Sequence, residues 1–179
     1  MSSTKMHPNT KAMLQAWQRM TSSTEDIDGG PSAQDYPGLL ARLFVIDASD
    51  RNHVLFRIAG DDLPVLLGRK LIGTDFLDLW TGSDRALVQA IIGSLLTDDR
   101  PGLIRGFGEA STGARMDIEV TLAPLGRTGT SCGRLLGLYQ SLGGDAQRLN
   151  RPVFIHGLKS VYLSEGVKRT RLRLVTQGG

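Results

Sequence analysis

The residue types that most often carry out chemistry are few in this chain and lie far apart. Cys132 is the only cysteine, which excludes an intramolecular disulfide and any cysteine-rich zinc or iron–sulfur site. A single cysteine near an expected strand more often packs than reacts. The three histidines, His7, His53 and His156, form no H-x-x-x-H or H-E-x-x-H motif. We therefore predict no metal site.

Two pairs of adjacent acids and one glycine-rich segment could suggest catalysis. Asp61 with Asp62, and Asp98 with Asp99, fall at expected helix ends, where neighbouring acids more often cap the helix. The segment GFGEASTG at 106–113 lacks the Lys-Ser/Thr of a phosphate-binding loop and is typical of a strand and a turn. No catalytic residue is predicted, and we expect a protein that is not an enzyme.

Composition favours one globular domain. The chain has 179 residues, of which 40% are hydrophobic and 22% charged, and no apolar run approaches the roughly 20 residues that span a bilayer. The N-terminal residues lack the apolar core of a signal peptide. We expect a cytoplasmic protein with no transmembrane segment.

Charge is distributed unevenly around a net value of +3. Between Thr21 and Asp62 there are eight acids and three arginines, whereas from Arg148 to the C-terminus seven basic residues accompany Glu165 as the single acid. Such a basic tail could bind nucleic acid, an anionic lipid surface or an acidic protein, or could be a solvated strand face. The candidates for such binding are Arg169, Arg171 and Arg173.

The N-terminus predicts a helix over residues 8–20 with an apolar stripe. The segment after it is rich in Ser, Thr, Gly, Asp and Pro and is typical of a linker, so we expect the helix to lie outside the core. The stripe then needs a partner, either the domain or the same helix of a second subunit. Its residues are our candidates for a dimer interface: Met13, Leu14, Trp17 and Met20.

A folded domain is expected to begin near Tyr36 and to alternate between strands and helices. Met116, Ile118, Val120 and Leu122 alternate with polar residues, which predicts a strand with one buried and one solvated face. The other strands follow from similar patterns and turn signals. The expected strands cover residues 39–47, 53–60, 103–109, 115–124 and 133–142. Short helices are expected between residues 61 and 80, and the longest helix over residues 83–96.

The element order, and the segment FRIAGDDLPVLLGRKLIGTDFLDLW at 56–80, resemble a bacterial PAS-like family first catalogued as a domain of unknown function. The resemblance covers roughly residues 36–142. It implies an α+β fold, a PAS-like five-stranded antiparallel sheet with helices across one face, to which this chain adds an N-terminal helix and a basic C-terminal extension that is either a strand or an unfolded tail. The expected divisions are 1–35, 36–142 and 143–179.

The resemblance implies a sensory or regulatory role, because PAS domains bind cofactors, bind metabolites or dock partners. A flavin photosensor of this type needs a cysteine in a motif like N-C-R-F-L-Q, and a haem sensor usually offers a histidine from the long helix. This chain has neither, so no cofactor is predicted. The expected cavity between helices and sheet would be walled by Phe56, Ile58, Leu67, Phe76, Trp80, Ile92, Leu96, Ile118, Val120 and Leu138. A filled core is the alternative for these residues.

Trp80 is the most informative of them, because a buried indole N–H needs a partner, either a ligand or a backbone carbonyl. Arg57 and Arg69 are the nearest charges that could meet an anionic metabolite. Our leading hypothesis is a regulatory protein that binds a partner protein in a signalling pathway, as a homodimer, with an unidentified small molecule possible in the cavity. The alternatives are a metabolite sensor whose ligand controls docking, and binding to an anionic surface or nucleic acid through the basic tail.

Overall fold

A seven-stranded antiparallel sheet forms the centre of the molecule in the computed structural model, which describes residues 5–22, 38–50, 52–126, 133–143, 152–164 and 172–175. The strand order is β2-β1-β5-β4-β3-β6-β7. The strands are β1 Leu43–Asp47, β2 Leu55–Ala59, β3 Gly102–Ala110, β4 Arg115–Leu125, β5 Arg134–Ser141, β6 Val153–Ser164 and β7 Leu172–Val175. The first five form the sheet expected from the sequence, and the C-terminal extension adds β6 and β7 beside β3. The predicted α+β fold is confirmed.

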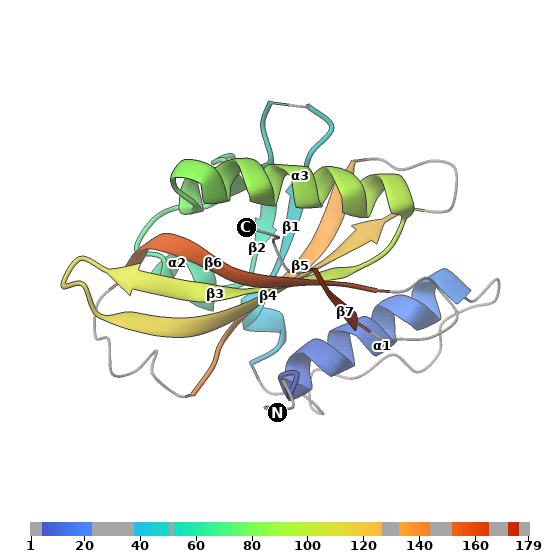
Figure 1. The fold of residues 1–179 in the computed structure, drawn as a ribbon, viewed down its shortest axis with the longest axis horizontal. Helices are drawn as coiled ribbons and strands as arrows, with labels where there is room; N and C mark the ends of the chain where they lie inside the picture. Colours follow the sequence, from blue (N-terminus) through green and yellow to red (C-terminus); the bar gives the residue numbers. More distant parts are fainter. Residues whose placement is uncertain are drawn as a thin grey trace.

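Helices cover both faces of this sheet. On the inner face lie α2 Asp62–Leu66, the 3-10 helix η2 Phe76–Leu79, and α3 Gly82–Asp98, while η1 Leu40–Arg42 leads into β1. The long helix α3 crosses one side of the sheet, and α1 Pro8–Ser22 lies on the other side (Figure 1). The main core therefore lies between the sheet and the three inner helices.

The central strand β4 shows how this arrangement changes a sequence pattern. Met116, Ile118 and Val120 face the main core, as their spacing predicts. The alternate residues Glu119 and Thr121 are also fully buried, although the pattern predicted a solvated face for them. That expectation is wrong because α1 contacts β4 and β5 on their outer side and excludes water there.

The position of α1 corrects the expectation that this helix lies outside the core. Met13 and Trp17 pack against Ala123 and Leu138 of the sheet, and the Trp17 indole nitrogen donates a 2.7 Å hydrogen bond to the Pro124 carbonyl. An amphipathic stripe shows that a helix needs an apolar partner, but not which surface provides it.

The stripe proposed for a dimer interface is thus covered by its own chain. Met13, Leu14 and Trp17 are buried in the monomer, and only Met20 remains 42% exposed. The premise that this stripe lacks a partner within the chain is wrong, and a dimer formed elsewhere remains a prediction.

Strand β6 carries a bulge that matters for the site. Glu109 of β3 pairs with Ile155 and Ala110 pairs with Val153, so Phe154 is an extra residue in β6. A bulge of this kind reverses the alternation of side chains beyond it. Consequently Val153 and His156, three residues apart, both become buried.

No helix among the described ranges is long and apolar enough to cross a membrane.

Candidate functional site

Most of the residues predicted to wall a cavity do come together on the inner face. The main core contains Phe56, Leu67, Phe76, Trp80, Ile92, Ile118 and Val120, and the partly buried Leu96 packs against it. These residues are contributed by strands and helices on both sides of the core, as the resemblance implied.

Two of the predicted wall residues do not reach this core. Ile58 is 60% exposed because Arg57 is an extra residue where β2 pairs with β1: Val45 pairs with Ile58, and Ile46 with Phe56. The bulge turns Ile58 away from the face that Phe56 occupies. Leu138 lies on the outer face, in the small cluster under α1. Both predictions are wrong.

Aromatic rings form a continuous series through the core. Phe44, Phe56 and Phe76 contact one another with ring centroids 5.6 Å apart. Trp80 continues the series at 6.4 Å from Phe76, and its ring lies 5.4 Å from that of His156. These separations are typical of favourable aromatic packing.

The series ends in a buried polar pair. The Tyr139 hydroxyl lies 2.8 Å from His156 Nε2, and His156 Nδ1 lies 3.2 Å from the Leu79 carbonyl oxygen. Because a carbonyl can only accept, Nδ1 carries the proton, and Nε2 of the neutral ring accepts from the Tyr139 hydroxyl. The Tyr139 hydroxyl and His156 Nε2 are thus hydrogen-bonded to each other, and His156 is present in one defined tautomer.

Burial keeps this pair uncharged. It lowers the pKa of His156 from 6.5 to about 4 and raises the pKa of Tyr139 above its usual range, since the charged form of each group loses its hydration. At neutral pH the pair is therefore a neutral hydrogen-bonded unit. Glycine at 108 leaves room for the neighbouring Val153, because a Cβ at position 108 would overlap the Val153 side chain.

Trp80 adds a hydrogen-bond donor that is not used. Its side chain is 2% exposed, and its Nε1 has no hydrogen-bond partner among the described residues. A buried N–H without a partner costs about 1–3 kcal/mol. We call Trp80, His156 and Tyr139 the core polar cluster. It contains one donor without an acceptor, the Trp80 N–H, and one hydrogen-bonded pair, His156 with Tyr139.

The sequence prediction identified Trp80 but missed His156 and Tyr139. His156 lies beyond the stretch that resembles a PAS domain. The face of the sheet on which its side chain lies depends on the bulge at Phe154. The available signal was a lone histidine within the apolar segment VFIHGL.

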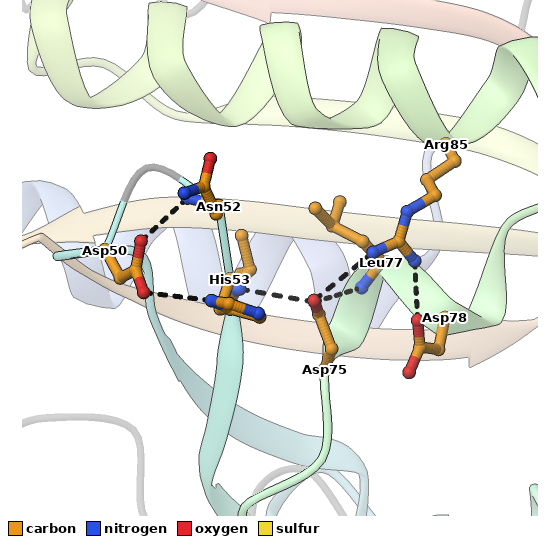
Figure 2. A network of polar contacts seen from close by, with 8 residues as sticks. Asp50, Asn52, His53, Asp75, Leu77, Asp78 and Arg85 are labelled. Atoms are coloured by element: carbon orange, nitrogen blue, oxygen red, sulfur yellow. Dashed lines mark hydrogen bonds and ion pairs between the residues drawn. The ribbon is translucent and has the colours of Figure 1, made fainter.

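A second polar network lies at the surface and has a structural role. Asp75 accepts hydrogen bonds from the backbone N–H groups of Leu77 and Val54, which ties the start of η2 to the segment before β2 (Figure 2). Arg85 of α3 pairs with Asp75 at 3.4 Å and with Asp78 at 2.6 Å. These contacts position α3 and η2 on the core.

His53, in the same region, is exposed and forms an ion pair with Asp50 at 2.9 Å (Figure 2). The hydrogen bond that His53 Nδ1 donates to the Asp50 carboxylate raises the pKa of His53. Within the described part of the chain, no group of three or more His, Cys, Asp or Glu residues could hold a metal ion.

The remaining sequence candidates are placed as follows. Arg57 pairs with Asp47 at 3.3 Å, and Arg69 donates to the Phe154 carbonyl oxygen at 3.2 Å, so each has a partner within the chain. Arg169 and Arg171 of the basic tail lie outside the described residues, as does Cys132. The backbone of Arg173 pairs with Leu163 in the ladder between β6 and β7.

The chain matches a family model described as PAS domain over residues 5–140, which includes α1. The chain belongs to the PAS domain family. A comparison with curated proteins finds no match.

Solved structures similar to this PAS protein include several LOV proteins. The LOV protein of Rhodobacter sphaeroides is 16% identical, with 75% of this chain and 70% of that chain covered and a TM-score of 0.47. The dark structure of the Aureochrome1 LOV photoreceptor is 16% identical, with coverages of 71% and 93% and a TM-score of 0.49. A fungal LOV photoreceptor is 18% identical, with coverages of 73% and 90% and a TM-score of 0.47.

The residues of this PAS protein do not fit a LOV-type flavin site. None of the helices that cover its core contains a cysteine. The rings of Phe44, Phe56, Phe76 and Trp80 pack against one another at 5.6–6.4 Å between the helices and the sheet. A flavin ring system would have to displace these rings.

Proposed function

We propose that this PAS protein is a non-enzymatic sensory and regulatory module that acts through protein–protein interaction, and that its input is a small molecule bound at the core polar cluster. The open indole N–H of Trp80 supports this function. It is a directional donor in an otherwise apolar core, next to the neutral pair of His156 and Tyr139. A ligand acceptor would relieve the cost of the unpaired N–H.

The surroundings define the chemistry of this ligand. A charged molecule would lose its hydration among buried rings, and the cluster offers it no opposite charge. A small, neutral and flat molecule with a carbonyl or similar acceptor would satisfy Trp80 and stack on the neighbouring rings. Binding would require these side chains to rearrange.

The core polar cluster is connected to the surface through the chain segments next to Trp80 and His156. Trp80 immediately precedes the N-cap of α3, Thr81, and forms a backbone bridge with His156 of β6. On β6, Phe154 and Ile155 are each 44% exposed. A ligand that moves Trp80 would therefore act on both α3 and the exposed apolar start of β6, where a protein partner could dock.

Native mass spectrometry of freshly purified full-length protein tests the input. The expected result is a native mass that exceeds the mass of the protein alone, as monomer or dimer, by the mass of a bound small molecule. The excess should be lost in Trp80→Phe, which removes the N–H but keeps a ring. The same spectrum reports whether the protein is a homodimer.

The matched control is Trp17→Phe, because Trp17 is the other tryptophan and donates to a backbone carbonyl rather than into the core. This variant should keep the excess mass. A wild-type native mass equal to the bare chain, as monomer or dimer, would reject the core ligand and leave partner docking as the whole function.

A further inference from the structure

The bulge in β2 places two consecutive side chains on the outer face of the sheet. Phe56 and Ala59 pack with the main core on the inner face. The two residues between them, Arg57 and Ile58, therefore both lie on the outer face, opposite Val45 of β1. Ile58 is 60% exposed there.

Ile58 is one end of an apolar row that crosses four strands. It pairs with Val45 of β1, which pairs with Leu136 of β5. Leu136 in turn pairs with Ala123 of β4. Helix α1 covers the far end of the row, because Ala123 is buried in the cluster that contains Trp17, and Leu136 is partly buried against it. Val45 is only partly buried and Ile58 is exposed. We call the open part of the row, Leu136, Val45 and Ile58, the β2 face.

Positive charge lies at one end of the β2 face. Asp47, the last residue of β1, pairs with Arg57 at 3.3 Å and with Arg134 of β5 at 3.6 Å. The two arginine side chains are 50% and 55% exposed, whereas the Asp47 side chain is 9% exposed. Two exposed guanidinium groups thus share one buried carboxylate, which leaves one positive charge in excess at this end.

Negative charge lies at the other end, where β2 leads into α2. Asp61 and Asp62 stand at the start of α2 and are both exposed. Arg42, directly before β1, pairs with Asp62 at 3.0 Å, so Asp61 supplies the excess charge. The two charged ends are separated by the length of β1, roughly 13 Å.

We propose that the β2 face binds the β2 face of a second copy of this chain in a two-fold symmetric dimer. A surface that binds itself in this way must be complementary to itself after a half-turn. The β2 face meets this condition, because its apolar centre lies between ends of opposite charge. A half-turn about an axis at Ile58 brings the arginines of one protomer opposite the partner's Asp61 and brings the two copies of Ile58 together.

This dimer goes beyond the function proposed above and is compatible with it. The strands β1, β5, β4 and β3 lie between β2 and β6. The exposed residues Phe154 and Ile155 of β6 therefore stay accessible to another protein when the β2 face is covered. A dimer of this kind also needs no contribution from the apolar stripe of α1, which is buried within its own chain.

The first test is size-exclusion chromatography with light scattering on the full chain at about 100 μM. The wild type should be a dimer. Ile58→Lys should raise the Kd about a hundredfold or more, because two isoleucines stay in water and two ammonium groups meet at the axis. Lysine is tolerated on an exposed edge strand, and an unchanged melting temperature would show that the variant folds.

The matched control is Ile155→Lys, which changes an exposed isoleucine beside the other bulge, in β6. It should remain a dimer. A monomeric wild type would assign the β2 face to a different protein and overturn the proposal, and a dimer that persists in Ile58→Lys would also overturn it. Ile58→Lys should keep the excess native mass expected for a core ligand, so the two proposals fail separately.

A cross-link tests the symmetry of the contact. Ile58→Cys in a Cys132→Ser background should form a disulfide-linked dimer under mild oxidation, because a disulfide needs Cα atoms about 4–7 Å apart and the axis brings the two copies of position 58 together. Ile155→Cys in the same background should not. Failure of the Ile58→Cys dimer to cross-link would place the interface elsewhere and overturn the proposal.

The charged ends are tested through Asp61→Lys. Asp61 makes no side-chain hydrogen bond to the start of α2, so its replacement should leave the fold intact. The variant should weaken the dimer about tenfold at low salt and by less at high salt, where the charges are screened. An unchanged Kd at low salt would contradict the complementarity on which the proposal rests.

Discussion

Acidification should destabilise this protein through a single buried histidine. His156 has a pKa of about 4 in the folded chain and 6.5 as an unperturbed group, because burial removes the hydration of its charged form. The unfolded chain therefore binds a proton at this residue at a pH where the folded chain does not. The stability contributed by neutral His156 is complete above about pH 6.5 and is lost as the pH falls toward about 4.

The size of the effect follows from this difference in pKa. Within that window the free energy of unfolding falls by up to about 1.4 kcal/mol per pH unit. Between about pH 7 and about pH 5 the loss amounts to about 2 kcal/mol. For a chain of this length the melting temperature should fall by roughly 4–8 °C.

The measurement is urea unfolding across this pH range, with His156→Gln as the comparison. Glutamine can still hydrogen-bond to Tyr139 and to the Leu79 carbonyl but does not titrate, so its stability should depend much less on pH. Both proteins should carry His53→Gln. The pKa of His53 is raised by Asp50, so its contribution is present below about pH 6.5 and lost as the pH rises, which opposes the effect of His156.

Equal pH dependence in the two proteins would refute the reasoning. An independent check needs no variant: the imidazole C–H signals of His156 should show a neutral ring at about pH 5, where exposed histidines are protonated. A His156 ring that titrates like an exposed histidine would mean that the core polar cluster is hydrated.

Three further predictions concern the faces of the sheet, each measured by urea unfolding. Arg105→Met should cost about 3–5 kcal/mol, because it leaves the carboxylate of Glu119 buried without its charge partner. The additional change Glu119→Gln removes the charge but keeps an oxygen acceptor for His7 and Thr10; it should restore stability, and no restoration would contradict the cause. Trp17→Phe should cost about 1–2 kcal/mol through the lost hydrogen bond to a backbone carbonyl, and an unchanged stability would mean that α1 is not docked. Gly137→Ala should cost about 1–3 kcal/mol, because a Cβ there would overlap the ring of Phe44. The comparison is Gly113→Ala, at a glycine that has no atom near the position of a Cβ and is constrained by its backbone angle alone, φ 80°.

Regular periodicity explains what the sequence predicted well. The long helix α3, the apolar side of β4 and the order of the first five strands follow from local patterns, since burial of one face requires the same spacing throughout an element. The contacts of Phe56, Phe76 and Trp80 in one core follow from that order and from the family resemblance.

The failures occur where a single residue changes the pattern or where the partner is distant in the sequence. An extra residue in a strand reverses every side chain beyond it, which moved Ile58 out of the core and His156 into it. Neither bulge has a local signature in the sequence. The burial of Glu119 depends on α1, more than 100 residues earlier in the chain.

By itself, the sequence determined the family, the α+β class, the identity of most core residues and the need of an apolar stripe at 8–20 for a partner. Only the tertiary structure decided which surface that stripe covers. It also brought Trp80, His156 and Tyr139 together. The physical reason is that secondary structure follows from local spacing, whereas a site arises from the registers and packing of elements that are far apart in the chain.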